Sequence, residues 1–423
     1  MKILIVSSSS WDVGNSFGNT FSNIFSEMEN VELYNVSCHH GEFNDDILAG
    51  AVQLTDRSVL KSIYKPDLDP CWRAQAVNND TSLNEEVSVS ARKKRRTVSY
   101  VIRDMIWRLG RWKRSKTLLS FLDEVKPDVI YLPIYASPYM CDVQQFIVDR
   151  LGVPVVGHIS DDVYGYPPKA SPIAHRYRKG LRKKLRRLIE KCEYLEVFAE
   201  NMRDEYEKKF SKPCYLIGKG VRREIIDAVK CDAPSGEVLH FVYTGNIGDE
   251  RYKALSDIGL GLSRAMPGRA VLDIYSQTPL NSEMEELLLN NGAISFHGGI
   301  SRAEVERVQS EADFLVHVEG FSPPAVFAAR MSFSTKIIDY LTASKPIFAY
   351  GPEEVNSIAV LKSQGLGVVA SSVAELDGCL AKIAGGEIDY GAITERVRAY
   401  LFGQRDIAVI QHGIYDRLNG LVD

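Results

Sequence analysis

The chain has 423 residues, of which 45% are apolar and 25% charged, as is ordinary for a folded, water-soluble protein. No run approaches the ~20 consecutive apolar residues of a membrane span, and the length exceeds that of one ordinary domain core, so both an integral membrane protein and a single small domain are excluded. The seven cysteines are scattered without a C-x-x-C pair, which indicates neither a zinc site nor a disulfide framework and predicts reduced thiols in the cytoplasm.

The net charge of -4 conceals two strongly basic segments. Residues 92–116 hold 11 basic residues and one acid, and residues 176–191 hold nine and one, so the two segments carry +10 and +8 and the remainder carries -22. Apolar residues recur at helical spacing in both, and Trp107 and Trp112 stand among the cations of the first. This pattern predicts peripheral binding to an anionic membrane, although solvated helices packed by an apolar stripe would show it too. No recognisable nucleic-acid module is present, so binding to nucleic acid is not expected.

The first half alternates short apolar strands with helical segments, which predicts a parallel sheet with crossover helices. The predicted strands are residues 3–6, 129–132, 153–156, 195–198 and 215–217. Polar residues 7–10 cut the first apolar run short, so it is expected to be a strand and not a signal peptide. Residues 55–98 are polar with little periodicity and are expected to form an insertion or a mobile loop.

A glycine-containing loop follows the first strand and opens a helix. Gly14, Asn15, Gly18 and Asn19 would allow a substrate to approach the backbone closely across a cleft. The glycine spacing is not G-x-G-x-x-G, and no acid is placed to bind a nicotinamide ribose, so a dinucleotide cofactor is not expected.

Polar groups also follow the strand at 153–156. His158, Asp161 and Asp162 would lie at the carboxyl end of the sheet, where ligands bind in open α/β folds, so they are candidate catalytic residues. A structural role for the histidine stays open. No metal ligands occur at recognisable spacing, and no metal site is predicted.

A second series of strands follows a polar linker near residues 218–237. The strands are predicted at residues 239–243, 270–275, 294–297, 314–318, 347–349 and 367–369, and the segment from Thr394 onward is predicted to be helical. The expected organisation is a first domain at 1–218, a second at 219–400 and a terminal helix at 401–423, whose docking site the sequence does not indicate.

Two strand ends of the second half carry candidate ligand-binding groups. Gly245 and Asn246 form a turn after the strand at 239–243, and Arg251 just beyond could hold a diphosphate bidentately. Glu319 stands at the tip of another strand, where it could bind a substrate hydroxyl, and is a further candidate catalytic residue. The long loop after it carries Arg330, so this loop is expected to bind the ligand.

The segment Ser332-Phe-Ser-Thr-Lys-Ile-Ile-Asp-Tyr-Leu341 combines an anion cradle with an acid. Ser334 and Thr335 stand where a helix should begin, so hydroxyls and free N–H groups would face an anion, and Lys336 adds a positive charge. Asp339 lies on the same helix face and would accept hydrogen bonds from ribose hydroxyls. The segment therefore predicts a sugar-nucleotide site.

These features together resemble the GT-B glycosyltransferases. More narrowly, Val316-His-Val-Glu319, the cradle at 332–341 and Lys345-Pro-Ile-Phe-Ala-Tyr-Gly-Pro352 are similar to family 4 enzymes from bacterial surface-polysaccharide loci. The architecture covers nearly the whole chain, whereas the specific motifs cover mainly residues 240–352 and the Asp161-Asp162 turn.

The resemblance implies an α/β fold of the GT-B type, with two Rossmann-like doubly wound domains facing a central cleft. It implies a retaining hexosyltransferase of capsule, O-antigen or exopolysaccharide synthesis that is cytoplasmic and peripheral on the membrane. The nucleotide-sugar donor would be held mostly by the second domain, and a lipid-linked or oligosaccharide acceptor by the first. Lys336 and Arg251 would neutralise the leaving diphosphate, so no metal or other cofactor is expected.

One position departs from the family pattern. The family commonly has Glu-x7-Glu, whereas Phe327 stands eight residues after Glu319, and Asp339 would take the ribose-binding role of the second glutamate.

Two other functions fit the same fold. A sugar-nucleotide epimerase would form its product without an acceptor, and a non-catalytic scaffold of a polysaccharide assembly complex would not need to bind a nucleotide.

Overall fold

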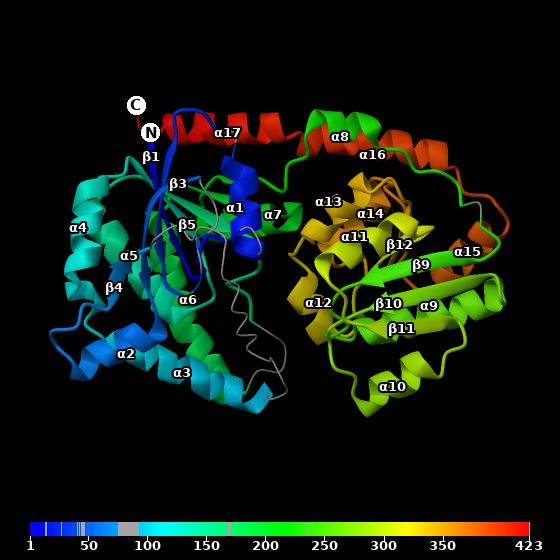
Figure 1. Cartoon of the computed structure of the whole chain (residues 1–423), viewed down its shortest axis with the longest axis horizontal. Helices are drawn as coiled ribbons and strands as arrows, with labels where there is room; N and C mark the ends of the chain where they lie inside the picture. The colour runs from blue at the N-terminus through cyan, green and yellow to red at the C-terminus, as the bar shows by residue number, and fades with distance from the viewer. Residues whose placement is uncertain are drawn as a thin grey trace.

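The computed structural model describes residues 1–12, 15–26, 28–39, 41, 43, 47–74, 93–166, 171–234 and 236–422. Two lobes lie side by side, and each is built on one sheet (Figure 1). The first sheet has the order β4-β3-β2-β1-β5-β6-β7-β8 and the second β11-β10-β9-β12-β13-β14. The predicted α/β class with two doubly wound sheets is confirmed.

The first sheet is parallel except for β4, which pairs antiparallel with β3. Its strands are β1 (Lys2–Ser7), β2 (Glu32–Ser37), β3 (Leu48–Leu54), β4 (Cys71–Arg73), β5 (Val129–Pro133), β6 (Val155–Ile159), β7 (Tyr194–Val197) and β8 (Cys214–Leu216). The helices of this part of the chain are α1 (Ser16–Phe25), α2 (Asp56–Tyr64), α3 (Lys93–Leu109), α4 (Lys116–Val125), α5 (Pro138–Leu151), α6 (Pro172–Lys191), α7 (Glu200–Phe210) and α8 (Arg223–Ala228), with a 3-10 turn η1 (Trp112–Arg114).

The second sheet is parallel throughout. Its strands are β9 (Leu239–Thr244), β10 (Ala270–Tyr275), β11 (Ile294–Gly298), β12 (Phe314–Val318), β13 (Ile347–Tyr350) and β14 (Val368–Ala370). The helices are α9 (Arg251–Ala265), α10 (Ser282–Leu289), α11 (Arg302–Glu311), α12 (Pro323–Ala329), α13 (Thr335–Thr342), α14 (Asn356–Ser363), α15 (Val373–Ala384), α16 (Tyr390–Arg405) and α17 (Ile407–Asn419).

The central strands are continuous apolar runs because helices cover both faces of each sheet. Every residue of β5 and of β12 is buried. The strands β2 and β3 escaped sequence prediction because buried polar residues interrupt their apolar pattern: Asn35 is fully buried and donates to the Ile5 carbonyl at 3.1 Å.

The segment expected to be an insertion or loop contains regular structure at its start. Helix α2 begins behind Thr55, whose hydroxyl accepts a hydrogen bond from the Ser58 N–H while the Ser58 hydroxyl accepts one from the Thr55 N–H, and β4 then joins the sheet edge. Residues 93–98 at its end belong to helix α3, and residues 75–92 lie outside the described residues.

The C-terminal helices connect the two lobes. Helix α16 lies along the second lobe and α17 along the first (Figure 1). Ile414 and Leu418 of α17 pack in the apolar cluster that contains Ile3 and Phe21, which places the terminal helix on the first lobe. Among the described residues, no helix is both long and apolar enough to cross a membrane.

Candidate functional site

Each sheet has a point where the strand order reverses. It lies between β1 and β5 in the first sheet and between β9 and β12 in the second, and ligands bind outside the carboxyl ends of strands at such points. A cavity of about 520 Å³ lies at the first point, and one of about 1130 Å³ lies at the second. Asn15, the N-cap of α1, lines both, so the cavities adjoin at the start of that helix.

The larger cavity lies between the lobes. The second lobe contributes Thr244, Gly245, Asn246, Tyr275, Ser276, Gln277, Thr278, Pro279, Gly299, Ile300, Arg302, Val305, Glu306, Gln309, Ser310, Thr335, Lys336, Asp339, Tyr340, Thr342 and Ala343. Asn15 and Asn19 of α1 and Lys219 of the linker complete the lining. The structure thus brings seven predicted site residues to one cavity: Asn15, Asn19, Gly245, Asn246, Thr335, Lys336 and Asp339.

Lys336 lies against the turn that follows β9. Its ammonium donates a hydrogen bond to the Thr244 carbonyl at 3.1 Å. A Cβ at Gly245 would stand 2.6 Å from the same Nζ, so only glycine lets the turn and the ammonium approach this closely. Partial burial lowers the pKa of Lys336, and the nearby charge of Arg251 lowers it further. The Lys336 ammonium is therefore held at the cavity wall by a backbone carbonyl. It forms no ion pair with a carboxylate among the described residues.

Glu319 holds Arg251. Its Oε2 accepts from Nη2 at 2.8 Å and from Nε at 3.0 Å, and the Glu319 residue is only 6% exposed. Burial raises the pKa of Glu319, while the guanidinium of Arg251 lowers it. Neither residue lines either of the two cavities, and the contact makes Glu319 a residue that positions Arg251.

Asp339 forms an ion pair with Lys219 from the interlobe linker. Sequence analysis missed Lys219 because it stands in a polar linker without any strand or helix end as a signal. This pair joins helix α13 to the segment that connects the lobes, so any ligand bound at Asp339 would have to share its carboxylate with this ammonium.

The structure corrects the expected surroundings of Asp162 and Arg330. Asp162 Oδ1 accepts from the Gly165 N–H at 2.9 Å and from the Tyr206 hydroxyl at 3.1 Å, and its Oδ2 accepts from Arg330 at 2.5 Å. Arg330 also reaches Glu205 of the first lobe at 3.1 Å. Neither Asp162 nor Arg330 lines either cavity, because both side chains are used in the contact between the lobes.

Two further residues of the loop after β12 also contact the first lobe. Ser332 donates to Asp161 at 2.6 Å, and Met331 is buried in the core of the first lobe. Ser334 is the N-cap of α13 without a side-chain capping bond, and it does not line the described cavities. The loop expected to bind the donor with Arg330 is thus an interlobe contact, and Asp161 belongs to it.

We expect Arg330→Ala to loosen this contact. The substitution leaves the Asp162 carboxylate, whose side chain is 6% exposed, without its cation and should lower the free energy of unfolding by about 1–3 kcal/mol. Urea unfolding and the radius of gyration from small-angle scattering measure both effects. Arg307→Ala, which removes an exposed pair within α11, is the matched control and should change stability by less than about 0.5 kcal/mol. Equal effects of the two substitutions would contradict the assignment.

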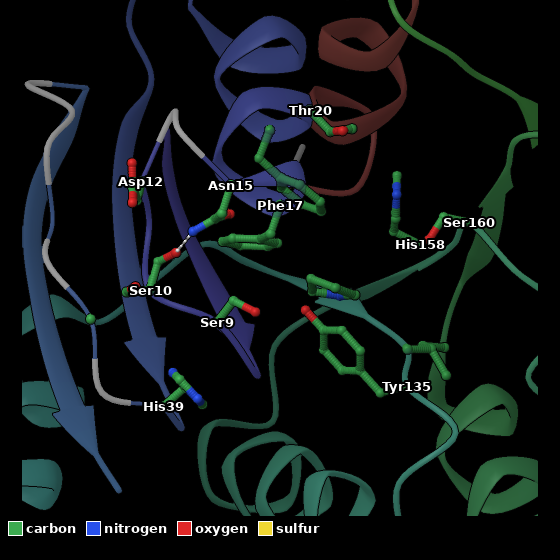
Figure 2. Close-up of a pocket in the computed structure, with 14 residues that line it drawn as sticks. Ser9, Ser10, Asp12, Asn15, Phe17, Thr20, His39, Tyr135, His158 and Ser160 are labelled. Atoms are coloured by element: carbon green, nitrogen blue, oxygen red, sulfur yellow. Dashed lines mark hydrogen bonds between the residues drawn. The ribbon is translucent and has the colours of Figure 1, made fainter. Parts of the chain in front are cut away.

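The smaller cavity lies within the first lobe (Figure 2). It is lined by Ser9, Ser10, Asp12, Asn15, Phe17, Thr20, Phe21, His39, Gly41, Pro133, Ile134, Tyr135, His158 and Ser160. Of these, sequence analysis indicated only Asn15 and His158. Gly18 packs against the backbone of Asp12 and does not face the cavity: a Cβ at Gly18 would stand 2.1 Å from the Asp12 carbonyl oxygen. Gly14 lies outside the described residues.

His158 belongs to a buried polar network on the α17 side of the sheet. Tyr131 donates its single hydroxyl hydrogen to Glu196, so its oxygen accepts from Nδ1 of His158 at 3.0 Å. Arg417 of α17 donates to the other oxygen of Glu196 at 2.8 Å. The neutral ring therefore carries its hydrogen on Nδ1 and leaves Nε2 as an acceptor.

The two buried histidines should make the protein sensitive to acid. Burial lowers the pKa of His158 and of His317 to about 3, so between about pH 3 and 6.5 the unfolded chain binds protons that the folded chain does not. Stability should fall as the pH drops below 6.5, by about 1.4 kcal/mol per pH unit for each histidine. Urea unfolding between pH 4.5 and 7 measures how the free energy of unfolding changes with pH. His317→Gln should lower this slope by the contribution of one histidine, and an unchanged slope would contradict the prediction.

Among the described residues, no three or more His, Cys, Asp or Glu side chains are placed to hold a metal ion.

No protein-family model and no curated protein matches the sequence. Solved structures do match over the whole chain. HepE from Anabaena, in complex with UDP, has a TM-score of 0.62 and 13% identity, with 99% of this chain and 100% of that chain covered.

Two further solved structures match over the whole chain. The lipopolysaccharide outer core galactosyltransferase WaaB in its apo form has a TM-score of 0.58 at 12% identity, over 99% of this chain and 100% of that one. Sucrose-phosphate synthase from Thermosynechococcus elongatus has a TM-score of 0.60 at 12% identity, over 100% and 99%. At such identities the likeness establishes the fold, and it confirms the predicted GT-B arrangement of two Rossmann-like domains that face a cleft.

Proposed function

We propose that the protein is a glycosyltransferase that moves a sugar from a nucleotide-sugar donor to a glycan acceptor. The observation that carries the proposal is the convergence of Lys336, Asp339 and the Gly245 turn on the interlobe cavity, opposite Asn15 and Asn19 of the first lobe. The fold neighbours support it, because HepE was solved with UDP and also with UDP-glucose.

In this proposal the second lobe binds the donor. Lys336 and Arg251 offset the charge that develops on the leaving diphosphate, and Glu319 keeps the Arg251 guanidinium oriented toward it. Asp339 accepts hydrogen bonds from the ribose. Because two cations of the chain supply this charge, we propose that transfer needs no metal, and activity should persist in EDTA.

The acceptor binds on the first lobe next to His158. The resemblance to family 4 enzymes leads us to propose that the sugar is a hexose, that its anomeric configuration is retained and that the product enters a bacterial capsule, O-antigen or exopolysaccharide. The contact of Arg330, Met331 and Ser332 with the first lobe would keep the cleft narrow, exclude water and favour transfer over hydrolysis.

Calorimetry against UDP, GDP, ADP and their sugars tests the donor site. We expect one nucleotide to bind, and Asp339→Asn to weaken its binding by about tenfold, as for loss of one charged hydrogen bond. Absence of binding by every nucleotide would favour the scaffold function. Conversion of the nucleotide sugar without an acceptor would favour the epimerase.

We also propose that the basic helices bind an anionic membrane, which would place the protein peripherally on the cytoplasmic face. One expectation needs correction: Trp107 and Trp112 are buried in the core, 2% and 1% exposed, and do not face a membrane. Other apolar residues of α3 are exposed instead: Tyr100, Val101, Ile102, Met105 and Leu109. Arg92 lies outside the described residues, and the side chains of residues 93–98 are not described.

Helix α6 adds charge beside this apolar surface. Tyr177 of α6 donates to Asp104 of α3 at 2.7 Å, and Arg176, Lys179 and Lys183 are exposed on α6. Vesicles rich in phosphatidylglycerol should therefore bind the protein more tightly at low salt than at high salt. The double substitution Ile102→Ser/Met105→Ser should reduce binding severalfold, whereas Val409→Ser on α17 should not; equal binding by all three proteins would remove α3 from the proposal.

A further inference from the structure

The two adjoining cavities differ in charge. The larger one is lined by Arg302, Lys219 and Lys336 together with the acids Glu306 and Asp339, whereas the described lining of the smaller one contains the acid Asp12 and neither lysine nor arginine. A phosphate group is bound in proteins mainly by arginine, lysine or a metal. The smaller cavity lacks lysine and arginine among its described residues.

The composition of the smaller cavity suits a sugar ring. Hydroxyl groups come from Ser9, Ser10, Thr20, Tyr135 and Ser160. Figure 2 shows Ser10, Asp12 and Asn15 on one side and His158 with Ser160 on the other, so polar groups face the space from two directions.

An apolar wall completes this cavity. The partly exposed ring of Phe17 is 4.5 Å from that of Phe21 and 5.5 Å from that of Trp11, so packing fixes its orientation. A flat ring beside many donors and acceptors matches a pyranose, which has apolar C–H faces and a rim of hydroxyls.

Among the described residues, the N-terminus of α1 is a feature that would favour an anion here. Residues of the chain already occupy part of this helix end. The Asn15 side chain accepts a hydrogen bond from the Gly18 N–H at 2.9 Å, and the backbone of Asp12 covers Gly18. The helix end therefore does not outweigh the absence of lysine and arginine from the described lining.

We propose that the smaller cavity binds an uncharged sugar unit of the acceptor and discriminates against phosphorylated sugars. This inference rests on the proposed transferase function and names the chemical class of its acceptor. The acceptor hydroxyl would approach the donor where the cavities meet at Asn15.

Ligand-observed saturation-transfer NMR tests the inference on the full chain in the presence of the nucleotide that binds best. The probes are methyl glycosides of glucose, galactose, mannose and N-acetylglucosamine, compared with glucose 6-phosphate and mannose 6-phosphate. We expect at least one neutral glycoside to bind with an affinity that changes less than about twofold between low and high salt, and the phosphates to bind more weakly. Preferred binding of a sugar phosphate, or binding of neither class, would overturn the inference.

Variants of Phe17 locate the binding. Phe17→Ala and the better-packed Phe17→Leu should both weaken glycoside binding, the former by roughly tenfold, with nucleotide binding within about twofold of wild type. Phe402→Ala, at an exposed phenylalanine of α16, is the control and should change neither. Unchanged glycoside binding by both Phe17 variants would overturn the location. If the wild type binds no nucleotide, the proposed function fails; if it binds nucleotide and no neutral glycoside, only this inference fails.

Discussion

Lys336→Ala should lower the rate of sugar transfer by about 10²- to 10³-fold, the usual effect of removing a preorganised group that stabilises charge in a transition state. The ammonium contacts the Thr244 carbonyl at 3.1 Å and lines the interlobe cavity, where the diphosphate is proposed to leave. Alanine removes the only lysine at this turn among the described residues. The rate is followed as nucleotide release from the preferred donor, with and without acceptor.

Two matched variants separate charge from structure. Lys382→Ala removes an exposed lysine of α15 in the same lobe and should leave the rate unchanged. Lys336→Arg keeps the charge and should retain more activity than alanine. Because Lys336 is exposed to the cavity, neither change should lower the free energy of unfolding by more than about 0.5 kcal/mol. A Lys336→Ala protein that turns over at the wild-type rate would remove the cradle from the mechanism.

The grouping of residues from the second lobe at the interlobe cavity was predictable because its signals are local in sequence. A strand end, a helix start and residues one turn apart define the group of Thr335, Lys336 and Asp339, and parallel strands then place Gly245 at the same edge. No long-range contact has to be known for this step.

The interlobe contact was not predictable for the opposite reason. Asp162 and Arg330 are 168 residues apart, and each on its own has the composition of a ligand-binding loop. Which charge pairs with which depends on how the lobes meet. The same holds for Lys219 with Asp339, and it explains why Arg330 was assigned to the donor.

Burial reversed the interpretation of other polar and aromatic residues. Trp107 and Trp112 stand among cations in the sequence, yet helix packing turns both indoles into the core, where Trp107 donates to Asp56 at 2.6 Å. The cavity beside His158 was missed because its lining comes from several strand ends and loops with ordinary serines and two phenylalanines, none of which forms a motif.

Arg417→Ala should be the most destabilising single change considered, at about 3–5 kcal/mol. Glu196 is fully buried, and Arg417 is the cation that offsets its charge across the boundary between the sheet and α17. Without the guanidinium the carboxylate must stay ionised at a high cost or take up a proton. Urea unfolding at pH 7 measures the loss, with His412→Ala on the exposed side of α17 as the control at less than about 0.5 kcal/mol.

The double variant Glu196→Gln/Arg417→Ala tests the physical cause. The neutral amide of Glu196→Gln keeps a hydrogen-bond acceptor for Tyr131 and carries no charge. Arg417→Ala should therefore lower the free energy of unfolding by about 1–2 kcal/mol less in the Glu196→Gln background than in the wild type. The hydrogen on His158 should respond as well: if Glu196 is neutralised, Tyr131 no longer has a charged acceptor, and the preference for Nδ1–H weakens, as nitrogen-15 NMR of the ring would show. An Arg417→Ala protein as stable as His412→Ala would mean that Glu196 carries no charge in the folded chain, and the assigned position of the hydrogen on His158 would lose its basis.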